Sequence, residues 1–109
     1  MHVLVTGPID PGTADFAAVR ALVDDAEKQG HRVIVPVLAI EGLNGSTSKE
    51  VIGRIRDTEK ALILSRAADE VRFAHPTAPD LAEVRAAAVG FQLWDPEKEQ
   101  PLQQKRWAR

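Results

Sequence analysis

The chain has 109 residues, of which 44% are hydrophobic and 5% are aromatic, and it contains no cysteine. Its 14 basic and 16 acidic side chains give a formal net charge of −2, so no overall positive charge is present to attract a nucleic acid backbone. The lack of cysteine excludes disulfides, thiolate nucleophiles and cysteine-based metal sites. No signal peptide or bilayer-spanning run is visible, and we expect one soluble, cytoplasmic α/β domain.

The first half of the chain predicts two strands around one helix. Residues 2–6 are rich in apolar and β-branched side chains and end at Gly7-Pro8, which is typical of a buried strand followed by a loop. We expect Thr13 to cap a helix with residues 16, 19, 22, 23 and 26 on its apolar face and Gly30 at its C′ position. A second strand is expected over residues 32–37, followed by a glycine-containing loop over residues 38–46.

The second half predicts two more helices and two more strands. Thr47 and Glu50 have the spacing of a capping box, and we expect a helix from there to about residue 67, with residues 51, 55, 58 and 62 on one face. Residues 61–64 are also compatible with a strand, but residues 70–74 supply the next strand and no turn signal separates the two. A turn then leads to a helix with residues 81, 84 and 88 on one face and Gly90 at its end, followed by a strand over residues 91–94.

Alternating strands and helices of these lengths predict a parallel sheet with helices on both faces. We expect a small doubly wound, flavodoxin-like or Rossmann-like three-layer sandwich with a four-stranded parallel sheet in the order 2-1-3-4. This domain covers residues 1–96, and residues 97–109 form a polar tail with a basic end. Ligands bind such sheets beyond the carboxyl ends of the strands, where the strand order reverses. The site is therefore expected between residues 7–13 and residues 75–80.

Several common site motifs are missing. No Gly-x-Gly-x-x-Gly follows the first strand, and no Gly-Lys-Ser/Thr is present, so dinucleotide and Walker A phosphate sites are not predicted. The three histidines, at positions 2, 31 and 75, do not have the spacing of metal ligands. We predict neither a metal nor a cofactor.

Three segments carry a resemblance to a known family. They are Val3-Leu4-Val5-Thr6-Gly7-Pro8-Ile9, then Gln29-Gly30-His31-Arg32-Val33-Ile34-Val35-Pro36, then Pro76-Thr77-Ala78-Pro79-Asp80-Leu81-Ala82-Glu83. In order and spacing, over roughly residues 2–94, they resemble the nucleoside 2-deoxyribosyltransferase superfamily, which includes the deoxynucleoside monophosphate N-glycosidases. The resemblance implies a nucleoside or nucleotide N-glycosidic-bond hydrolase or deoxyribosyltransferase that needs no cofactor and is a homo-oligomer.

The resemblance also implies roles for particular residues. Glu83 falls at the position of the family's glutamate nucleophile, which would trap the sugar covalently at C1′. Thr77 falls at a hydroxyl position that contacts the sugar or phosphate. Asp57 and Asp69 loosely match acidic residues that flank the family's third helix.

We expect the remaining site residues on the two loops at the same edge of the sheet. Gly7, Pro8, Asp10 and His75 would line the site together with Thr77, and Asp80 would assist catalysis. Thr13 is a further candidate, although it first serves as a helix cap.

Some residues depart from the family pattern. The family's tyrosine in the first strand is replaced by Leu4, and glycines before the glutamate are replaced by Ala78, Pro79 and Ala82. The monophosphate-specific members carry an arginine soon after the first loop glycine, and that place is taken here by Asp10, which would repel a 5′-phosphate. A catalytically inactive module that binds a nucleotide-derived ligand, as a sensor or sequestering protein, is therefore the alternative function.

Each candidate also has a purely structural interpretation. An acidic Glu83 in a first turn stabilises a helix, Thr77 and Asp80 have N-cap spacing, Gly7 suits a tight turn, and a strand-end His75 is compatible with a solvated side chain. Glu83 pointing into an open pocket would favour an enzyme or a binding module. Glu83 on the outer surface or in a salt bridge would favour a third possibility, an oligomeric domain with no small-molecule site. The basic tail is compatible with docking on another subunit.

Overall fold

The computed structural model describes residues 1–10, 12–46, 49–89, 93–95 and 100–101, and within them four strands alternate with helices and a fifth strand follows the fourth. The strands are β1 (His2–Thr6), β2 (Arg32–Ile34), β3 (Glu70–Phe73), β4 (Leu93–Asp95) and β5 (Gln100–Pro101). The α-helices are α1 (Phe16–Lys28), α2 (Lys49–Leu64) and α3 (Ala82–Ala87), and the 3₁₀ helices are η1 (Pro36–Ser46) and η2 (Pro79–Leu81).

The strands form one sheet in the order β2-β1-β3-β4-β5. The central strand β1 is parallel to both neighbours, and Leu4 lies opposite Ile34 of β2 and Val71 of β3. Strand β4 is parallel to β3, and β5 is antiparallel to β4. The α/β class and the order of the first four strands agree with the prediction. The fifth strand was not expected, and it lies in the segment predicted to be a polar tail.

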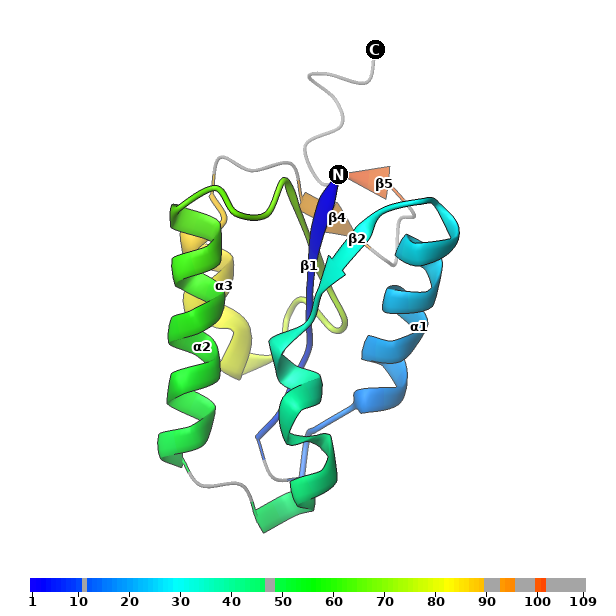
Figure 1. Cartoon of the computed structure of the whole chain (residues 1–109). Coiled ribbons are helices and arrows are strands. Elements are labelled where there is room, and N and C mark those ends of the chain that lie inside the picture. The colour runs from blue at the N-terminus through cyan, green and yellow to red at the C-terminus, as the bar shows by residue number, and fades with distance from the viewer. Residues whose placement is uncertain (11, 47–48, 90–92, 96–99, 102–109) are drawn as a thin grey trace.

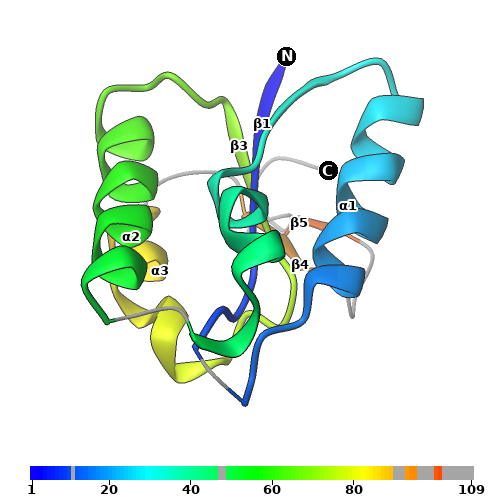
Figure 2. The ribbon, with the colours of Figure 1, turned by 60° about the horizontal axis from the view of Figure 1, so that its bottom comes forward.

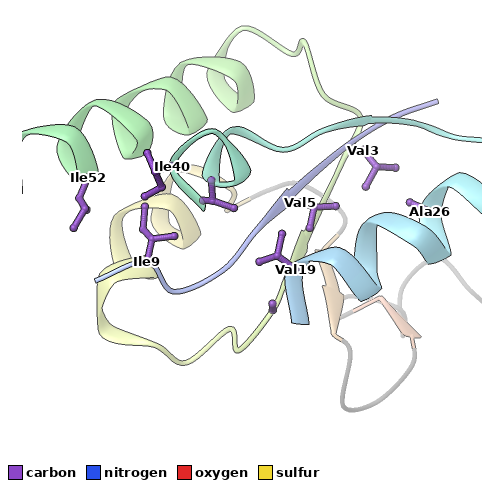
Figure 3. Close-up of a cluster of buried hydrophobic side chains, with 9 residues drawn as sticks. Val3, Val5, Ile9, Val19, Ala26, Ile40 and Ile52 are labelled. Atoms are coloured by element: carbon purple, nitrogen blue, oxygen red, sulfur yellow. The ribbon is translucent and has the colours of Figure 1, made fainter. Parts of the chain in front are cut away.

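Helices cover both faces of the sheet, with α1 on one side and α2 and α3 on the other (Figure 1). Successive side chains of a strand point to opposite faces, so β1 contributes to two cores. Val3 and Val5 pack with Val19 and Ala26 of α1 (Figure 3). Leu4 packs on the other face in a cluster with Ile63 of α2 and Val84 of α3.

Helix α1 confirms its predicted end but corrects its predicted start. Gly30 follows the C-cap Gln29 with a φ of +88°, the left-handed conformation that the C′ position requires. The N-cap is Asp15, whose Oδ1 accepts a hydrogen bond from the Ala18 amide at 3.1 Å. Thr13 was the wrong candidate, because its hydroxyl donates to the Asp10 carbonyl within the preceding turn.

The segment after β2 is helical, which the prediction of a loop over residues 38–46 missed. Pro36 has no amide hydrogen for a strand ladder, and η1 begins at this residue. Val37 and Ile40 of η1 are buried beside Ile9 and Ile52 in the core of the α1 face (Figure 3).

Helix α2 includes residues 61–64, as preferred over a strand, but its inward face is not the predicted one. The buried positions are Ile52, Arg56, Glu59 and Ile63. Val51, Ile55 and Leu62 are only partly buried, and Thr58 is exposed. The spacing of apolar residues predicted the wrong face because two of the four inward positions, Arg56 and Glu59, carry charged side chains.

The third helical segment also begins differently from its prediction. It starts with η2, whose N-cap Ala78 makes no side-chain hydrogen bond, so Thr77 is not a helix cap. Leu81, Val84 and Ala88 are fully buried, as their spacing predicted.

Several predictions concern residues beyond the described ranges. The Thr47 cap, Gly90, residues 91–92 and the basic end of the tail lie outside them. Within the described ranges, none of the helices combines the length and the hydropathy needed to span a bilayer.

Candidate site at the carboxyl edge of the sheet

The strand order reverses between β1 and β3, and the loops that follow these two strands lie side by side (Figure 2). The Ala74 amide donates to the Thr6 carbonyl at 2.8 Å, which extends the pairing of the two strands by one residue. Beyond the ends of the two strands, the Ile9 amide donates to Asp80 Oδ2 at 3.0 Å. The two segments expected to hold a site are therefore in direct contact.

A buried arginine of α2 holds this edge together. Nη2 of Arg56 donates to the Gly7 carbonyl and to Asp80 Oδ2, each at 2.7 Å. Nη1 donates to Thr6 Oγ1 at 2.8 Å and to Glu59 Oε1 at 2.5 Å. We call these residues, Thr6, Gly7, Arg56, Glu59 and Asp80, the Arg56 cluster. It joins the end of β1, the middle of α2 and the loop after β3.

The Arg56 cluster holds one cationic side chain and two carboxyl groups away from water. Glu59 is fully buried, and the side chains of Arg56 and Asp80 are 7% and 8% exposed. Burial raises the pKa of Glu59, although the neighbouring Arg56 charge acts in the opposite direction. Glu59 Oε2 and Arg56 Nε have no hydrogen-bond partner in the described part of the chain.

A second pair at the same edge, an imidazole and a carboxylate, faces solvent. His75 follows β3, and its Nε2 lies 2.7 Å from Oδ2 of Asp15, the N-cap of α1. The side chains are 55% and 38% exposed. The hydrogen bond from His75 is the largest of the contacts that lower the pKa of the Asp15 carboxyl. His75 also has a φ of +60°, in the left-handed region that costs energy for a residue with a side chain.

The predicted residues of the first loop are mainly structural in this conformation. A Cβ at Gly7 would lie 2.6 Å from Val19 Cγ2 and 3.2 Å from Ala74 Cβ, so glycine allows α1 to approach β1 closely. Pro8 is buried, and its carbonyl accepts from the Asp15 amide at 3.2 Å. The Asp10 carbonyl accepts from the amides of Thr13 and Ala14 in the following turn.

The predicted residues of the second loop separate from one another. Thr77 is exposed, and Asp80 is engaged in the Arg56 cluster. Glu83 lies on the surface of α3 with its side chain 75% exposed, and its Oε1 accepts a hydrogen bond from Lys60 Nζ of α2 at 2.7 Å. This contact raises the pKa of Lys60. The structure thus brings Asp80 and His75 to the edge together with the first loop, whereas Glu83 occupies a surface ion pair.

Sequence reasoning missed Arg56, Glu59 and Asp15. Arg56 and Glu59 lie between Ile52 and Ile63 at spacings of four, three and four residues, which is the spacing of one helical face. That periodicity is a usable signal, although charged residues at such positions are usually assigned to solvent. Asp15 precedes Phe16 and was passed over in favour of Thr13 as the cap.

Comparison of the chain with protein-family models, curated proteins and solved structures finds no match. Within the described residues, no group of three or more histidine and acidic side chains is placed to hold a metal ion. An imidazole that is hydrogen-bonded to a carboxylate has the arrangement of a general base and the group that orients it.

Proposed function

We propose that this chain binds a nucleoside or nucleotide at the carboxyl edge between β1 and β3 and cleaves its N-glycosidic bond. The proposal assigns the chain to a doubly wound, flavodoxin-like or Rossmann-like domain with four parallel strands. One observation carries it. The loops after β1 and β3 meet where the strand order reverses, with the Ile9 amide on Asp80 and His75 on Asp15. Ligands of such sheets bind at this position, and the sequence resemblance supplies the class of ligand and reaction.

The position of Glu83 bears on how the bond would be broken. Cleavage passes through an oxocarbenium-like state, which a carboxylate below C1′ can trap before water or a second base completes the reaction. In this route, which we call the glutamate route, Glu83 must first break its 2.7 Å hydrogen bond to Lys60 and then contact the sugar. This ion pair counts against the glutamate route in the conformation described here.

The same ion pair favours a second candidate, a module that binds the ligand without turnover. Such a protein needs the two loops at the edge but no nucleophile. A third interpretation, an oligomeric domain with no small-molecule site, is also compatible with an ion-paired Glu83 on the surface.

One experiment separates the three functions. The protein is incubated with ribonucleosides, 2′-deoxynucleosides and their 5′-monophosphates, free base is measured by chromatography, and binding of each compound is measured by calorimetry. Release of base supports the enzyme, and binding without release supports the module. If the protein neither binds any compound of the panel nor releases base from it, the proposed function is overturned.

The variant Glu83→Gln tests the glutamate route within that experiment. Loss of base release by several orders of magnitude is expected if the carboxylate is the nucleophile. Glu50→Gln is the matched control, because Glu50 is another exposed glutamate in the first turn of a helix and pairs with Arg54.

A further inference from the structure

We propose that His75, oriented by Asp15, is the general base that activates water for attack on C1′, so that the reaction at this edge is hydrolysis without a covalent sugar–Glu83 intermediate. This inference rests on the proposed function. It names His75 as a catalytic residue and Asp15 as a positioning residue.

The first argument is that Asp15 is itself held in place. Its Oδ1 accepts from the Ala18 amide at 3.1 Å, and its own amide donates to the Pro8 carbonyl at 3.2 Å. Oδ2 is left for His75 Nε2 at 2.7 Å. A carboxylate fixed in this way orients the imidazole and stabilises its protonated form, which is the role of the third group behind a general base.

The second argument is the backbone of His75. Its φ of +60° lies in the left-handed region, where non-glycine residues are uncommon and are concentrated at functional sites. Hydrogen bonds flank this residue: the Ala74 amide donates to the Thr6 carbonyl, and the His75 carbonyl accepts from the Ala78 amide at 3.0 Å. The chain therefore turns at His75, and its side chain meets Asp15 across the point where the strand order reverses.

The third argument is that Asp80 and Glu83, the two carboxylates predicted to be catalytic, are both bonded to cationic side chains. Asp80 is 8% exposed and bonded to Arg56 and Ile9, and Glu83 is bonded to Lys60. The His75 side chain is 55% exposed, so solvent reaches it. With Nε2 donating to Asp15, Nδ1 is the ring nitrogen that can accept a proton.

The reaction balances with water as the only co-reactant. Water gives one proton to Nδ1 of His75 while its oxygen forms the new bond to C1′. The C1′–N bond breaks, and its electron pair stays on the nitrogen of the leaving base. That nitrogen takes up the proton carried by His75, which yields the free base and the free sugar and regenerates the neutral imidazole.

The decisive variant is His75→Gly, because glycine adopts a φ of +60° without strain. We expect kcat for base release to fall by about 10²–10⁴-fold, the usual contribution of general base catalysis, and added imidazole to restore part of it. Arg66→Gly is the matched control, since Arg66 also has a left-handed φ, +62°, at the far end of α2. It should leave kcat and the imidazole dependence unchanged.

Asp15→Ser tests the positioning role separately from the helix cap. Serine is an N-cap as good as aspartate, but it is too short to reach His75. We expect kcat to fall by about 10²-fold or more with KM little changed, whereas a purely structural role would leave kcat near that of the wild type.

Product analysis completes the test. With a second free base present, the water route yields free sugar and no exchanged nucleoside, and Glu83→Gln retains activity. Base release that survives in His75→Gly, or an exchanged nucleoside whose formation requires Glu83, overturns the assignment of His75 and leaves the proposed function intact. No base release by the wild-type protein from any compound overturns the proposed function and this inference with it.

Discussion

The Arg56 cluster and the Asp15–His75 pair lie at the same edge of the sheet and differ in their access to water. Each connects the loop after β3 to another element, through Asp80 to α2 in the first case and through His75 to α1 in the second. The side chains of the cluster are at most 8% exposed, whereas Asp15 and His75 are 38% and 55% exposed. The buried, hydrogen-bonded side chains of the Arg56 cluster fix the geometry of this edge. The solvent-exposed Asp15 and His75 are accessible to a ligand.

The two regions should also differ in how much their mutations change the free energy of unfolding. A buried ion pair contributes little over a well-packed apolar substitute, but removing one partner leaves an uncompensated charge in the interior. The interaction within an exposed pair is screened by water and contributes little to the free energy of folding. Mutations in the Arg56 cluster should therefore change stability, and mutations of the exposed pair should change activity.

The largest effect is expected for Arg56→Met. Loss of the guanidinium removes a buried donor from Asp80, Glu59 and the Gly7 carbonyl, and the free energy of unfolding should fall by about 3–5 kcal/mol. Urea denaturation measures this change. Arg54→Met, two residues away in an exposed pair with Glu50, is the control and should cost far less. Equal losses in the two variants would show that burial does not distinguish these arginines.

The next largest effect is expected for Gly7→Ala, since Gly7 lies between the two regions. Its carbonyl belongs to the Arg56 cluster, and an added Cβ would collide with Val19 of α1. Overpacking of this kind costs about 1–3 kcal/mol. Gly53→Ala is the control, because a Cβ there meets nothing within 4 Å and lies in the interior of α2. It should raise stability by about 0.5–1 kcal/mol.

A smaller effect is expected for Asp15→Ala, which removes the N-cap of α1 together with the His75 contact. The free energy of unfolding should fall by about 1 kcal/mol, the usual value of a cap. Asp15→Ser should recover most of this loss, while its kcat for base release stays about 10²-fold or more below that of the wild type. If the serine variant were as unstable as the alanine variant, the His75 contact rather than the cap would carry the stability.

The smallest change in stability is expected for Glu59→Gln, and its pH dependence is the readout. A carboxyl whose pKa is raised by folding binds its proton more tightly in the folded state. Its contribution to stability is therefore fully present below the ordinary glutamate value of 4.5 and is lost as the pH rises toward the raised pKa. Glutamine keeps the shape of the side chain and removes this titration.

Unfolding curves measured from pH 4 to pH 8 test that expectation. The wild-type protein should lose stability relative to Glu59→Gln as the pH rises over this range. A difference between the two proteins that is constant with pH would contradict a raised pKa at Glu59.

The sequence by itself predicted several elements of the fold and the edge at which we propose a site. The largely apolar residues 2–6 predicted β1, Gly30 predicted the end of α1, and the alternation of elements predicted the α/β class. The order 2-1-3-4 expected for such a sheet agrees with the order of the first four strands. These features depend on neighbours in the chain, on hydrophobic periodicity and on the conformational freedom of glycine. The edge between residues 7–13 and 75–80 followed from the predicted ends of the first and third strands and from the place where ligands bind such sheets.

Only the tertiary structure decided which side chains meet at that edge. The spacing within α2 places Arg56 and Glu59 on one helical face, but it does not show that Thr6, Gly7 and Asp80 lie against them. Glu83 and Lys60 meet on the surface because α3 packs beside α2. Asp15 and His75 are separated by 60 residues in the chain and by 2.7 Å in the fold. Burial and partners of a charged group are properties of the packed chain, because the cost of desolvating a charge is offset only by neighbours that folding supplies.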